Sequence, residues 1–273
     1  MRYGSKEAEN VVTTAISPAQ ASSEAAGKAL RISNLSKSFG GLQAIQDITL
    51  DLHTGIITSL VGPNGAGKTT LFNTITGHIK PDTGTVQFEG HSLVGHPPWK
   101  IARMGVMRTF QDLRLFMHMS VEDNVLAAME PRSWFWQPAG RQANNARRER
   151  TAAILKETGL SAKAGSLAGS LSYAERKFLS LARIMATDAR LWLLDEPAAG
   201  LDPPSYELFQ DLLRNQVQRG ISVCIIEHNL DIITAISDRI AFLDQGRVIA
   251  EGEPSKILED PKLIEIYFGG GQS

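Results

Sequence analysis

One glycine-rich segment has residue types and spacing that suit the binding of phosphate groups. Residues 62–69, Gly-Pro-Asn-Gly-Ala-Gly-Lys-Thr, fit the pattern GxxxxGK[ST]. They follow the apolar, β-branched run 56–61, which predicts a buried strand, and they open a predicted helix at 68–78. In that setting the glycines let backbone N–H groups curl around phosphates, and the helix N-terminus adds favourable partial charge. We therefore predict a nucleotide-binding loop formed by Gly62, Pro63, Asn64, Gly65, Ala66, Gly67, Lys68, Thr69 and Thr70.

Two side chains of this loop have distinct expected roles. Lys68 is expected to contact the β- and γ-phosphates of ATP, and the hydroxyl of Thr69 is expected to bind Mg²⁺. The alternative is an ordinary glycine-rich strand-to-helix turn with a solvated lysine. The complete pattern, in its strand-to-helix context, favours the phosphate loop.

A second candidate site is a pair of carboxylates at the end of an apolar strand. Residues 191–197 read Leu-Trp-Leu-Leu-Asp-Glu-Pro. Asp195 is placed to hold Mg²⁺, commonly through water, and Glu196 to polarise an attacking water. In isolation, two acidic residues leading into a turn would be the simpler interpretation. Together with the phosphate loop, they predict a nucleotide-hydrolysing site.

The apolar pattern predicts the elements that must position these residues. Residues 29–52 alternate in short segments broken by Gly40-Gly41, which is typical of strands with one buried face. From about 112 to 188 the periodicity is helical, which predicts an inserted helical subdomain. Beyond it, strands and helices alternate, as in a parallel sheet with helical crossovers. The expected strands are 30–35, 48–52, 56–61, 85–88 after a turn at 82–84, 191–194, 221–226, 240–243 and 247–250, and the later expected helices are 204–219 and 229–237.

Composition limits the classes of protein to which the chain can belong. At 273 residues with 42% hydrophobic content, it is expected to form one globular unit. A net charge of −1 gives no global attraction for nucleic acid or an anionic bilayer. Cys224, the single cysteine, lies in an apolar run and is expected to be a small buried residue, which suits a reducing cytosol. No run of about 18 apolar residues occurs, so no spanning helix is expected, and residues 1–28 and 270–273 are expected to be tails.

Between the two nucleotide motifs lies a segment that resembles the signature of a particular family. Residues 171–175, Leu-Ser-Tyr-Ala-Glu, followed by a helical stretch at 176–186, are similar to the LSGGQ motif of ABC ATPases. The resemblance covers the chain from about residue 29 to 268. It implies an α/β fold with a phosphate-loop (RecA-like) parallel sheet core, an N-terminal antiparallel β subdomain and the inserted helical subdomain. It also implies a single ABC ATPase domain over 29–269.

The same resemblance assigns roles to residues outside the two motifs. Phe39 matches the aromatic that stacks on adenine, and Gln111 matches the glutamine that senses Mg²⁺ and the γ-phosphate. Asp202 matches the loop that crosses the dimer interface, although it could simply cap the following helix. His228 matches the switch histidine at the γ-phosphate, and Ser172 the signature serine that binds the ATP of the other subunit.

Four segments narrow the resemblance within the family. Residues 198–201, 226–230, 236–239 and 264–269 look most like ATPase subunits of branched-chain amino acid importers, to which urea and amide importers are related. This implies membrane-spanning permease subunits, a second ATPase subunit, an extracytoplasmic solute-binding protein and a peripheral location on the cytoplasmic face of the inner membrane. No nucleic-acid partner is expected. The alternative, a soluble ABC ATPase acting on nucleic acid or ribosomes, usually carries two cassettes or long coiled coils, neither of which is present.

The signature departs from the family pattern at two positions. Ala174 adds a methyl group where backbone must approach phosphate, and Glu175 adds negative charge near that anion. Both changes are expected to weaken one ATP site, which suggests a heterodimer rather than a homodimer. Alternatively, Ser172 and Glu175 form a capping box at a helix N-terminus. A further segment, 132–150, combines aromatic and basic residues and either grips a partner or lipid surface or packs on its own helix.

Overall fold

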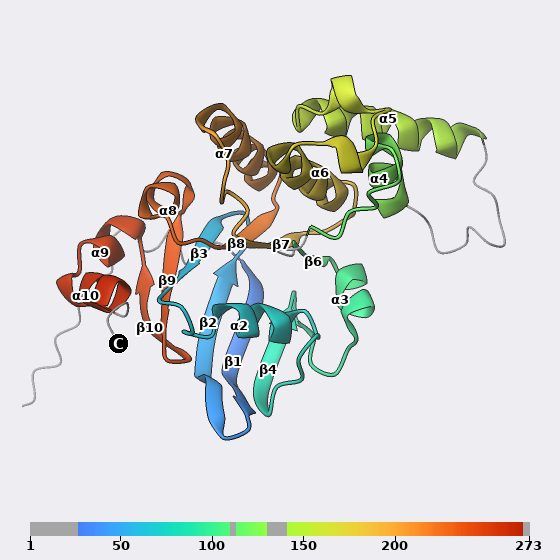
Figure 1. Ribbon diagram of the computed structural model, residues 1–273. Coiled ribbons are helices and arrows are strands. Elements are labelled where there is room, and N and C mark those ends of the chain that lie inside the picture. Colours follow the sequence, from blue (N-terminus) through green and yellow to red (C-terminus); the bar gives the residue numbers. More distant parts are fainter. Residues whose placement is uncertain (1–26, 110–112, 130–140, 270–273) are drawn as a thin grey trace, which may run out of the picture.

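The computed structural model describes residues 27–109, 113–129 and 141–269. Figure 1 shows the order of the elements along the chain. The strands are β1 (Lys28–Phe39), β2 (Leu42–His53), β3 (Ile57–Val61), β4 (Thr83–Phe88), β5 (His91–Ser92), β6 (Val106–Arg108), β7 (Leu191–Asp195), β8 (Ser222–Ile226), β9 (Arg239–Asp244) and β10 (Arg247–Gly252). The helices are α2 (Lys68–Ile75), α3 (Pro98–Met104), α4 (Val121–Ala128), α5 (Arg141–Glu157), α6 (Tyr173–Met185), α7 (Pro203–Gln218), α8 (Leu230–Ile236), α9 (Pro254–Leu258) and α10 (Pro261–Gly269), with short 3₁₀ turns η1 (Ser161–Lys163) and η2 (Ala168–Ser170).

The larger sheet has the strand order β10-β9-β3-β8-β7-β6. Five of its strands pair in parallel, and β10 joins the edge as the antiparallel half of a hairpin with β9. The crossovers from β7 to β8 and from β8 to β9 pass through α7 and α8. This confirms the predicted α/β fold with a parallel core. Because the strands run in parallel, the carboxyl ends of β3, β6, β7 and β8 meet at one edge of the sheet, where ligands of such folds bind.

The central strands are buried on both faces, which explains their nearly continuous apolar sequences. In β7, Leu191 and Leu193 belong to the core cluster shared with α2 and the second sheet. The intervening Trp192 and Leu194 belong to the cluster shared with α6 and α7. All five residues of β7 are buried. The strand that ends in the two carboxylates is therefore held rigidly from above and below.

The smaller sheet has the order β2-β1-β4-β5 and is antiparallel. β1 and β2 are both 12 residues long, longer than the segments predicted from the sequence, and β1 begins at Lys28, inside the predicted N-terminal tail. β-bulges interrupt their pairing, and each bulge shifts the inward-facing positions by one residue. The sequence of this hairpin therefore shows the alternation of buried and exposed residues only in short fragments. Likewise, β4 begins at Thr83, within the predicted turn.

Helix α2 is shorter than predicted because a glycine ends it. It stops at Ile75 instead of continuing to His78. Gly77 has a φ of 74°, and the His78 N–H donates to the carbonyl of Asn73 at 2.9 Å. A glycine in the left-handed region with such a bond closes a helix C-terminus.

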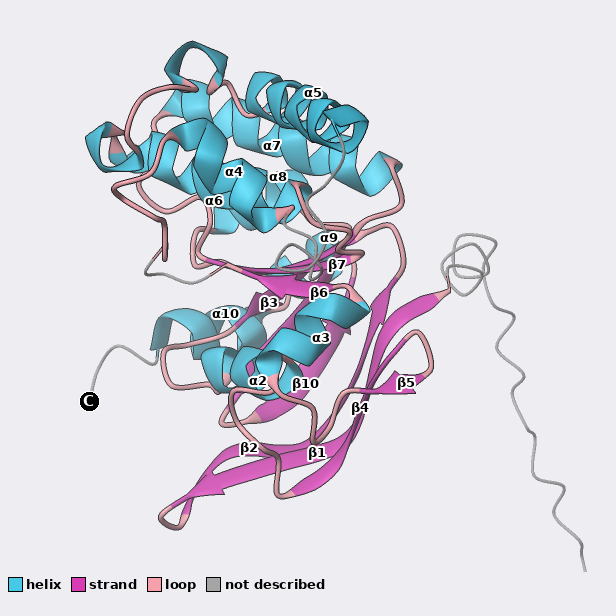
Figure 2. Ribbon diagram, turned by 90° about the vertical axis from the view of Figure 1, so that its right-hand side faces the viewer, coloured by secondary structure: helices cyan, strands magenta, loops and turns pink. Residues whose placement is uncertain are grey.

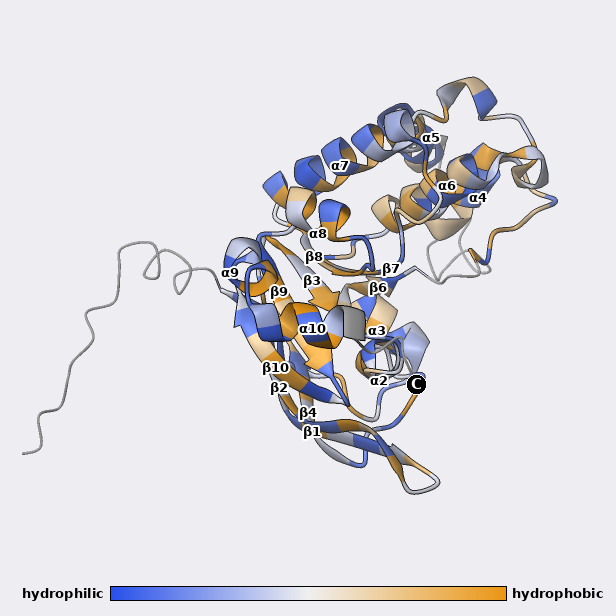
Figure 3. Ribbon diagram, turned by 60° about the vertical axis from the view of Figure 1, so that its left-hand side comes forward, coloured by the Kyte–Doolittle hydropathy of each residue, from blue (hydrophilic) through white to orange (hydrophobic). Residues whose placement is uncertain are grey.

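Helices α4 to α7 form a layer on the opposite side of the parallel sheet from β1 and β2 (Figure 2). Residues of α4, α5, α6 and α7 share one apolar cluster with Trp192 and its neighbours in the sheet. Figure 3 shows hydrophobic and hydrophilic bands along α7, as expected of a helix with one buried face. Among the described residues, no helix has both the length and the apolar character required to cross a membrane.

Candidate functional site

The phosphate loop connects β3 to α2, as predicted. Two of its glycines are required by close packing: a Cβ on Gly62 would collide with the carbonyl oxygen of Leu243, and one on Gly67 with that of Ala44. Gly67 also has a φ of 102°, a region that side-chain-bearing residues rarely adopt. The loop is thus packed closely against β9 and β2.

Lys68 lies at the first position of α2 and is 6% exposed. Its ammonium group donates to the carbonyl oxygens of Gly62 at 2.6 Å and Pro63 at 2.9 Å, inside its own loop. Burial lowers the pKa of Lys68, while the nearby carboxylates of Glu196 and Asp195 act in the opposite direction. The buried ammonium group of Lys68, close to these two carboxylates, can neutralise the phosphate oxygens of a bound nucleotide.

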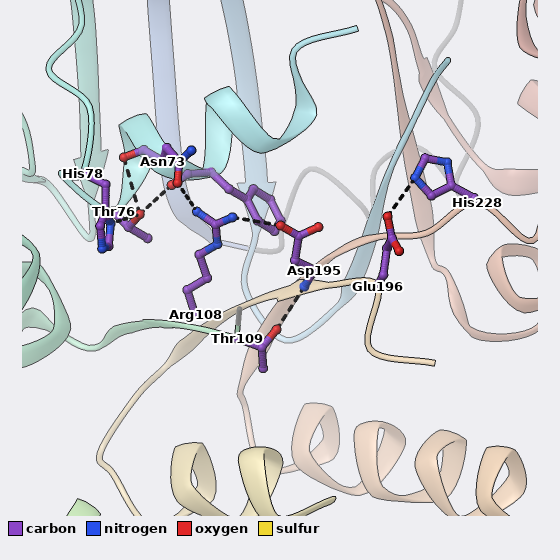
Figure 4. A network of polar contacts seen from close by, with 9 residues as sticks. Asn73, Thr76, His78, Arg108, Thr109, Asp195, Glu196 and His228 are labelled. Carbon is purple, nitrogen blue, oxygen red and sulfur yellow. Dashed lines mark hydrogen bonds and ion pairs between the residues drawn. The ribbon is translucent and has the colours of Figure 1, made fainter. Parts of the chain in front are cut away.

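Asp195, the last residue of β7, is fixed by two neighbours on β6 and just after it (Figure 4). Its Oδ2 atom accepts a hydrogen bond from Arg108 at 2.8 Å, with both side chains at least 95% buried. Its backbone N–H donates to the hydroxyl of Thr109 at 3.0 Å. Arg108 in turn donates to Asn73 on α2 at 2.6 Å and lies 5.5 Å from the ring centroid of Phe72. Asp195 is therefore tied to the helix that follows the phosphate loop.

The second carboxylate oxygen of Asp195 supports a cation site. Oδ1 is buried and has no hydrogen-bond partner among the described residues. A buried carboxylate oxygen left unpaired is costly unless it serves a ligand. Oxygen ligands from carboxylates, hydroxyls and phosphates are those that Mg²⁺ prefers. The unpaired Oδ1 of Asp195 therefore fits the metal predicted for this site.

Glu196 follows β7 with a φ of 48°, in the left-handed region that is strained for residues other than glycine. Two hydrogen bonds hold this conformation: its N–H donates to Ile226 at 2.9 Å, and Lys177 of α6 donates to its carbonyl oxygen at 2.8 Å. Its carboxylate Oε1 lies 3.2 Å from Nε2 of His228 (Figure 4). From this turn the Glu196 side chain reaches His228 and lines the same cleft as the phosphate loop.

One cleft of about 750 Å³ brings most of the predicted site together. This volume is typical of a site for a small ligand such as a nucleotide. Phe39, one of the lining residues, is 46% exposed, and the Lys37 ammonium lies 5.4 Å from its ring centroid. Predicted residues that line the cleft are Phe39, Asn64, Gly65, Ala66, Gly67, Lys68, Thr69, Thr70, Glu196 and His228.

Five predicted residues with described structure do not line this cleft: Gly62, Pro63, Asp195, Ser172 and Asp202. The carbonyls of Gly62 and Pro63 accept from Lys68 within the loop, and Asp195 lines a second pocket together with Glu196. Ser172 and Asp202 line a separate hollow of about 520 Å³, together with Ala174 and Glu175. Ser172 is the N-cap of α6, and with Glu175 it forms the predicted capping box. Asp202 caps α7 by accepting from the Ser205 N–H at 3.2 Å. Gln111 lies outside the described residues, as do the tails 1–26 and 270–273 and positions 132–140 of the aromatic and basic segment.

The structure adds residues that sequence reasoning missed. Lys177 is 7% exposed and Glu227 is 3% exposed; burial lowers the pKa of Lys177 and raises that of Glu227. Glu227 accepts from the N–H of Ala198, in the loop after the carboxylate pair, at 2.9 Å. Of the cleft-lining residues, Gln43, Gln46 and Gln245 were also not predicted, because no local motif distinguishes them. Cys224, as predicted, is buried, and burial raises the pKa of its thiol to about 12.

The cleft brings the phosphate loop together with Glu196 at the end of β7, a combination that defines a nucleotide-binding ATPase. Comparison with known families agrees, because the family described as ABC transporter matches residues 45–199. The chain belongs to the ABC transporter family, as an ATP-binding cassette. The predicted family, fold class and ATPase activity are thereby confirmed.

Curated relatives and solved structures match most of the chain. The high-affinity branched-chain amino acid transport ATP-binding protein BraF of Pseudomonas aeruginosa is 38% identical, over 88% of this chain and 97% of its own. LivG of Salmonella typhimurium, described in the same words, is 40% identical with the same coverage. A crystal structure of an ATP-binding cassette of an ABC transporter in its ADP conformation has a TM-score of 0.78 at 32% identity and covers 89% of this chain and 99% of that one. CbiO1 of Clostridium perfringens, described as part of the ABC transporter complex cbiONQ, has a TM-score of 0.75 at 27% identity and covers 87% of this chain and 93% of its own. The alternative of a nucleic-acid ATPase gains no support from these relatives.

Proposed function

We propose that this chain hydrolyses ATP to drive the import of branched-chain amino acids through separate permease subunits. The observation that carries the ATPase role is the single cleft lined by Lys68, Glu196 and His228. Support for the solute class comes from BraF and LivG, whose names specify branched-chain amino acid transport and whose lengths this chain nearly spans.

Within the cleft, each residue has a proposed task. Lys68 binds the β- and γ-phosphates, and Phe39 stacks on the adenine. Glu196 orients the attacking water, while His228 contacts the γ-phosphate. Mg²⁺, when bound, neutralises charge on the phosphate oxygens, and Thr69, Asp195 and Gln111 are the residues proposed to hold it. The 3.2 Å contact between Glu196 and His228 supports their joint action at the terminal phosphate.

The remaining partners follow from the family. We infer a peripheral position on the cytoplasmic face of the inner membrane, two permease subunits, an extracytoplasmic solute-binding protein and a second ATPase subunit. Ser172 and Asp202 line a hollow separate from the chain's own cleft. That separation supports a dimer in which the signature of each subunit completes the ATP site of the other.

Transport by the reconstituted complex tests the proposed function. Proteoliposomes containing the full chain and its co-purified permease subunits, with the solute-binding protein and Mg²⁺·ATP supplied, are expected to accumulate radiolabelled leucine. Vesicles made with Lys68→Ala are the matched control and are expected to accumulate none, because the phosphate contact is lost. If the wild-type complex hydrolyses ATP but no branched-chain amino acid accumulates, the solute class is wrong and the ATPase role stands.

The unusual signature predicts an asymmetry between the two ATP sites. Glu175 accepts from the Ser172 N–H at 2.8 Å and pairs with Lys163 at 2.5 Å. The Lys163 ammonium and the Ser172 N–H hold the pKa of Glu175 below its usual range, so the carboxylate is charged but already compensated. Ala174, in contrast, has no such compensation, and it lines the hollow that we propose faces the partner's ATP. The obstruction is therefore expected to come from Ala174.

Reversion of the signature separates these two effects. Ala174→Gly is expected to raise ATP hydrolysis by the heterodimer roughly fivefold, because relief of a methyl-sized steric conflict is worth about 1 kcal/mol. Glu175→Gln alone is expected to change the rate little, since glutamine can still close the capping box. Steady-state phosphate release with the partner subunit present measures both. An unchanged rate in the double variant would remove the proposed asymmetry.

A further inference from the structure

Glu196 and His228, whose side chains meet in the cleft, each have a backbone carbonyl oxygen that accepts a hydrogen bond from a helix elsewhere in the chain. Lys177 on α6 donates to the carbonyl oxygen of Glu196 at 2.8 Å. Tyr267 on α10, 39 residues beyond His228, donates its hydroxyl hydrogen to the carbonyl oxygen of His228 at 2.5 Å. The second contact connects the described C-terminal end of the chain to the ATP site, and the proposed function does not account for it.

Tyr267 is well placed to act as a fixed support. Its ring packs edge-on against Phe242 of β9, with centroids 6.2 Å apart and planes at 70°. Leu263 of the same helix is buried in a cluster with Val61, the last residue before the phosphate loop, and with Ile233 of α8. Burial raises the pKa of the Tyr267 hydroxyl, so it remains a donor at neutral pH. Helix α10 thus rests on the same strands that carry the nucleotide loops.

The backbone around His228 needs such support. β8 ends at Ile226 and α8 begins at Leu230, so His228 lies in a connection without regular structure. Glu227 is anchored by its buried carboxylate, and Asn229 caps α8 through hydrogen bonds to Asp231 and Ile232. Between these two fixed points, the Glu227 carboxylate interacts with the backbone N–H of His228, and the Tyr267 hydroxyl donates to its carbonyl oxygen.

We propose that Tyr267 is a positioning residue for the switch histidine. Its hydroxyl fixes the His228 carbonyl, which sets the direction of the imidazole towards the γ-phosphate, and α10 is thereby coupled to ATP hydrolysis. This inference rests on the proposed role of His228. The ring of Tyr267 serves packing, and only its hydroxyl serves the histidine.

Tyr267→Phe in the full-length chain tests the inference, because it removes the hydroxyl and keeps the ring on Phe242. Loss of one hydrogen bond of ordinary strength is expected to lower kcat for ATP roughly fivefold. The Kd for ADP is expected to be unchanged, because ADP lacks the γ-phosphate. Tyr206→Phe is the matched control: it removes a hydroxyl bonded to Gln210 at 2.7 Å on α7, and its kcat is expected to stay within twofold of wild type.

A double variant distinguishes positioning from general damage. In a His228→Ala background, Tyr267→Phe is expected to cause no further loss of kcat, since no imidazole remains to be aligned. An unchanged kcat for Tyr267→Phe beside a reduced kcat for His228→Ala would overturn the inference alone. Normal kcat in His228→Ala would overturn the proposed role of His228 itself. Equal losses from Tyr267→Phe in both backgrounds, or a raised Kd for ADP, would assign Tyr267 to packing.

Discussion

Replacement of Glu196 by glutamine is expected to lower ATP turnover by about a hundredfold or more. Glutamine has nearly the same shape, so it can keep the strained φ of 48° and the backbone bonds to Ile226 and Lys177. It can also accept from a neutral His228 imidazole in place of the carboxylate. What it loses is the negative charge that polarises the attacking water, and this loss acts on hydrolysis rather than on nucleotide binding.

The same variant is therefore expected to accumulate with ATP bound. Size-exclusion chromatography with Mg²⁺·ATP should show a persistent closed dimer, and the Kd for ATP should remain near that of the wild type. Glu207→Gln, which changes an exposed glutamate on α7, is the control and should hydrolyse ATP normally. Near-normal turnover in Glu196→Gln would show that Glu196 is not the residue that orients the water.

Most of the cleft could be predicted because its residues are close together in the sequence. The phosphate loop is one continuous segment, and Asp195 and Glu196 are adjacent at the end of an apolar strand, so spacing alone places each group at a strand end. Parallel strands then bring those ends to one edge. The capping box of α6 is equally local, since it needs only the spacing of Ser172 and Glu175.

The supporting contacts could not be predicted, because they join residues that are distant in the sequence. Arg108 and Asp195 are 87 residues apart, and the Tyr267 hydroxyl meets a backbone carbonyl that any residue could supply. Apolar periodicity predicts which face of an element is buried, but not which polar side chain crosses from one element to another. Asn34 and Asp47, in the bulged hairpin of β1 and β2, have a left-handed backbone that the sequence did not predict. The alternation of apolar and polar residues is already irregular in this hairpin, so neither residue stands out as a break in it.

Among the residues that the sequence did not mark, Arg108 has the largest expected effect on stability. Arg108→Met keeps much of the apolar stem but leaves the Asp195 carboxylate, whose side chain is 2% exposed, without its charged partner. Breaking a buried pair in this way costs about 3–5 kcal/mol, because the carboxylate stays in the interior without its hydrogen-bonded cation. Urea unfolding of the nucleotide-free chain measures the loss. Mg²⁺·ATP is expected to stabilise this variant more than the wild type, because a cation at Asp195 would again compensate the carboxylate.

Arg219→Met is the control that distinguishes the effect of burial on stability from the effect of hydrogen-bond geometry. Arg219 makes two hydrogen bonds to Glu157, at 2.9 and 3.0 Å, whereas Arg108 makes one to Asp195. The Arg219 pair is exposed, with side chains at 55% and 34%, so its loss is expected to cost only about 0.2–1 kcal/mol. If the two variants lose equal stability, desolvation is not what makes the Arg108–Asp195 pair important. The expected result is a several-fold larger loss in the free energy of unfolding for Arg108→Met, partly recovered with Mg²⁺·ATP. It would show that the stability of the core depends on a positive charge next to the Asp195 carboxylate.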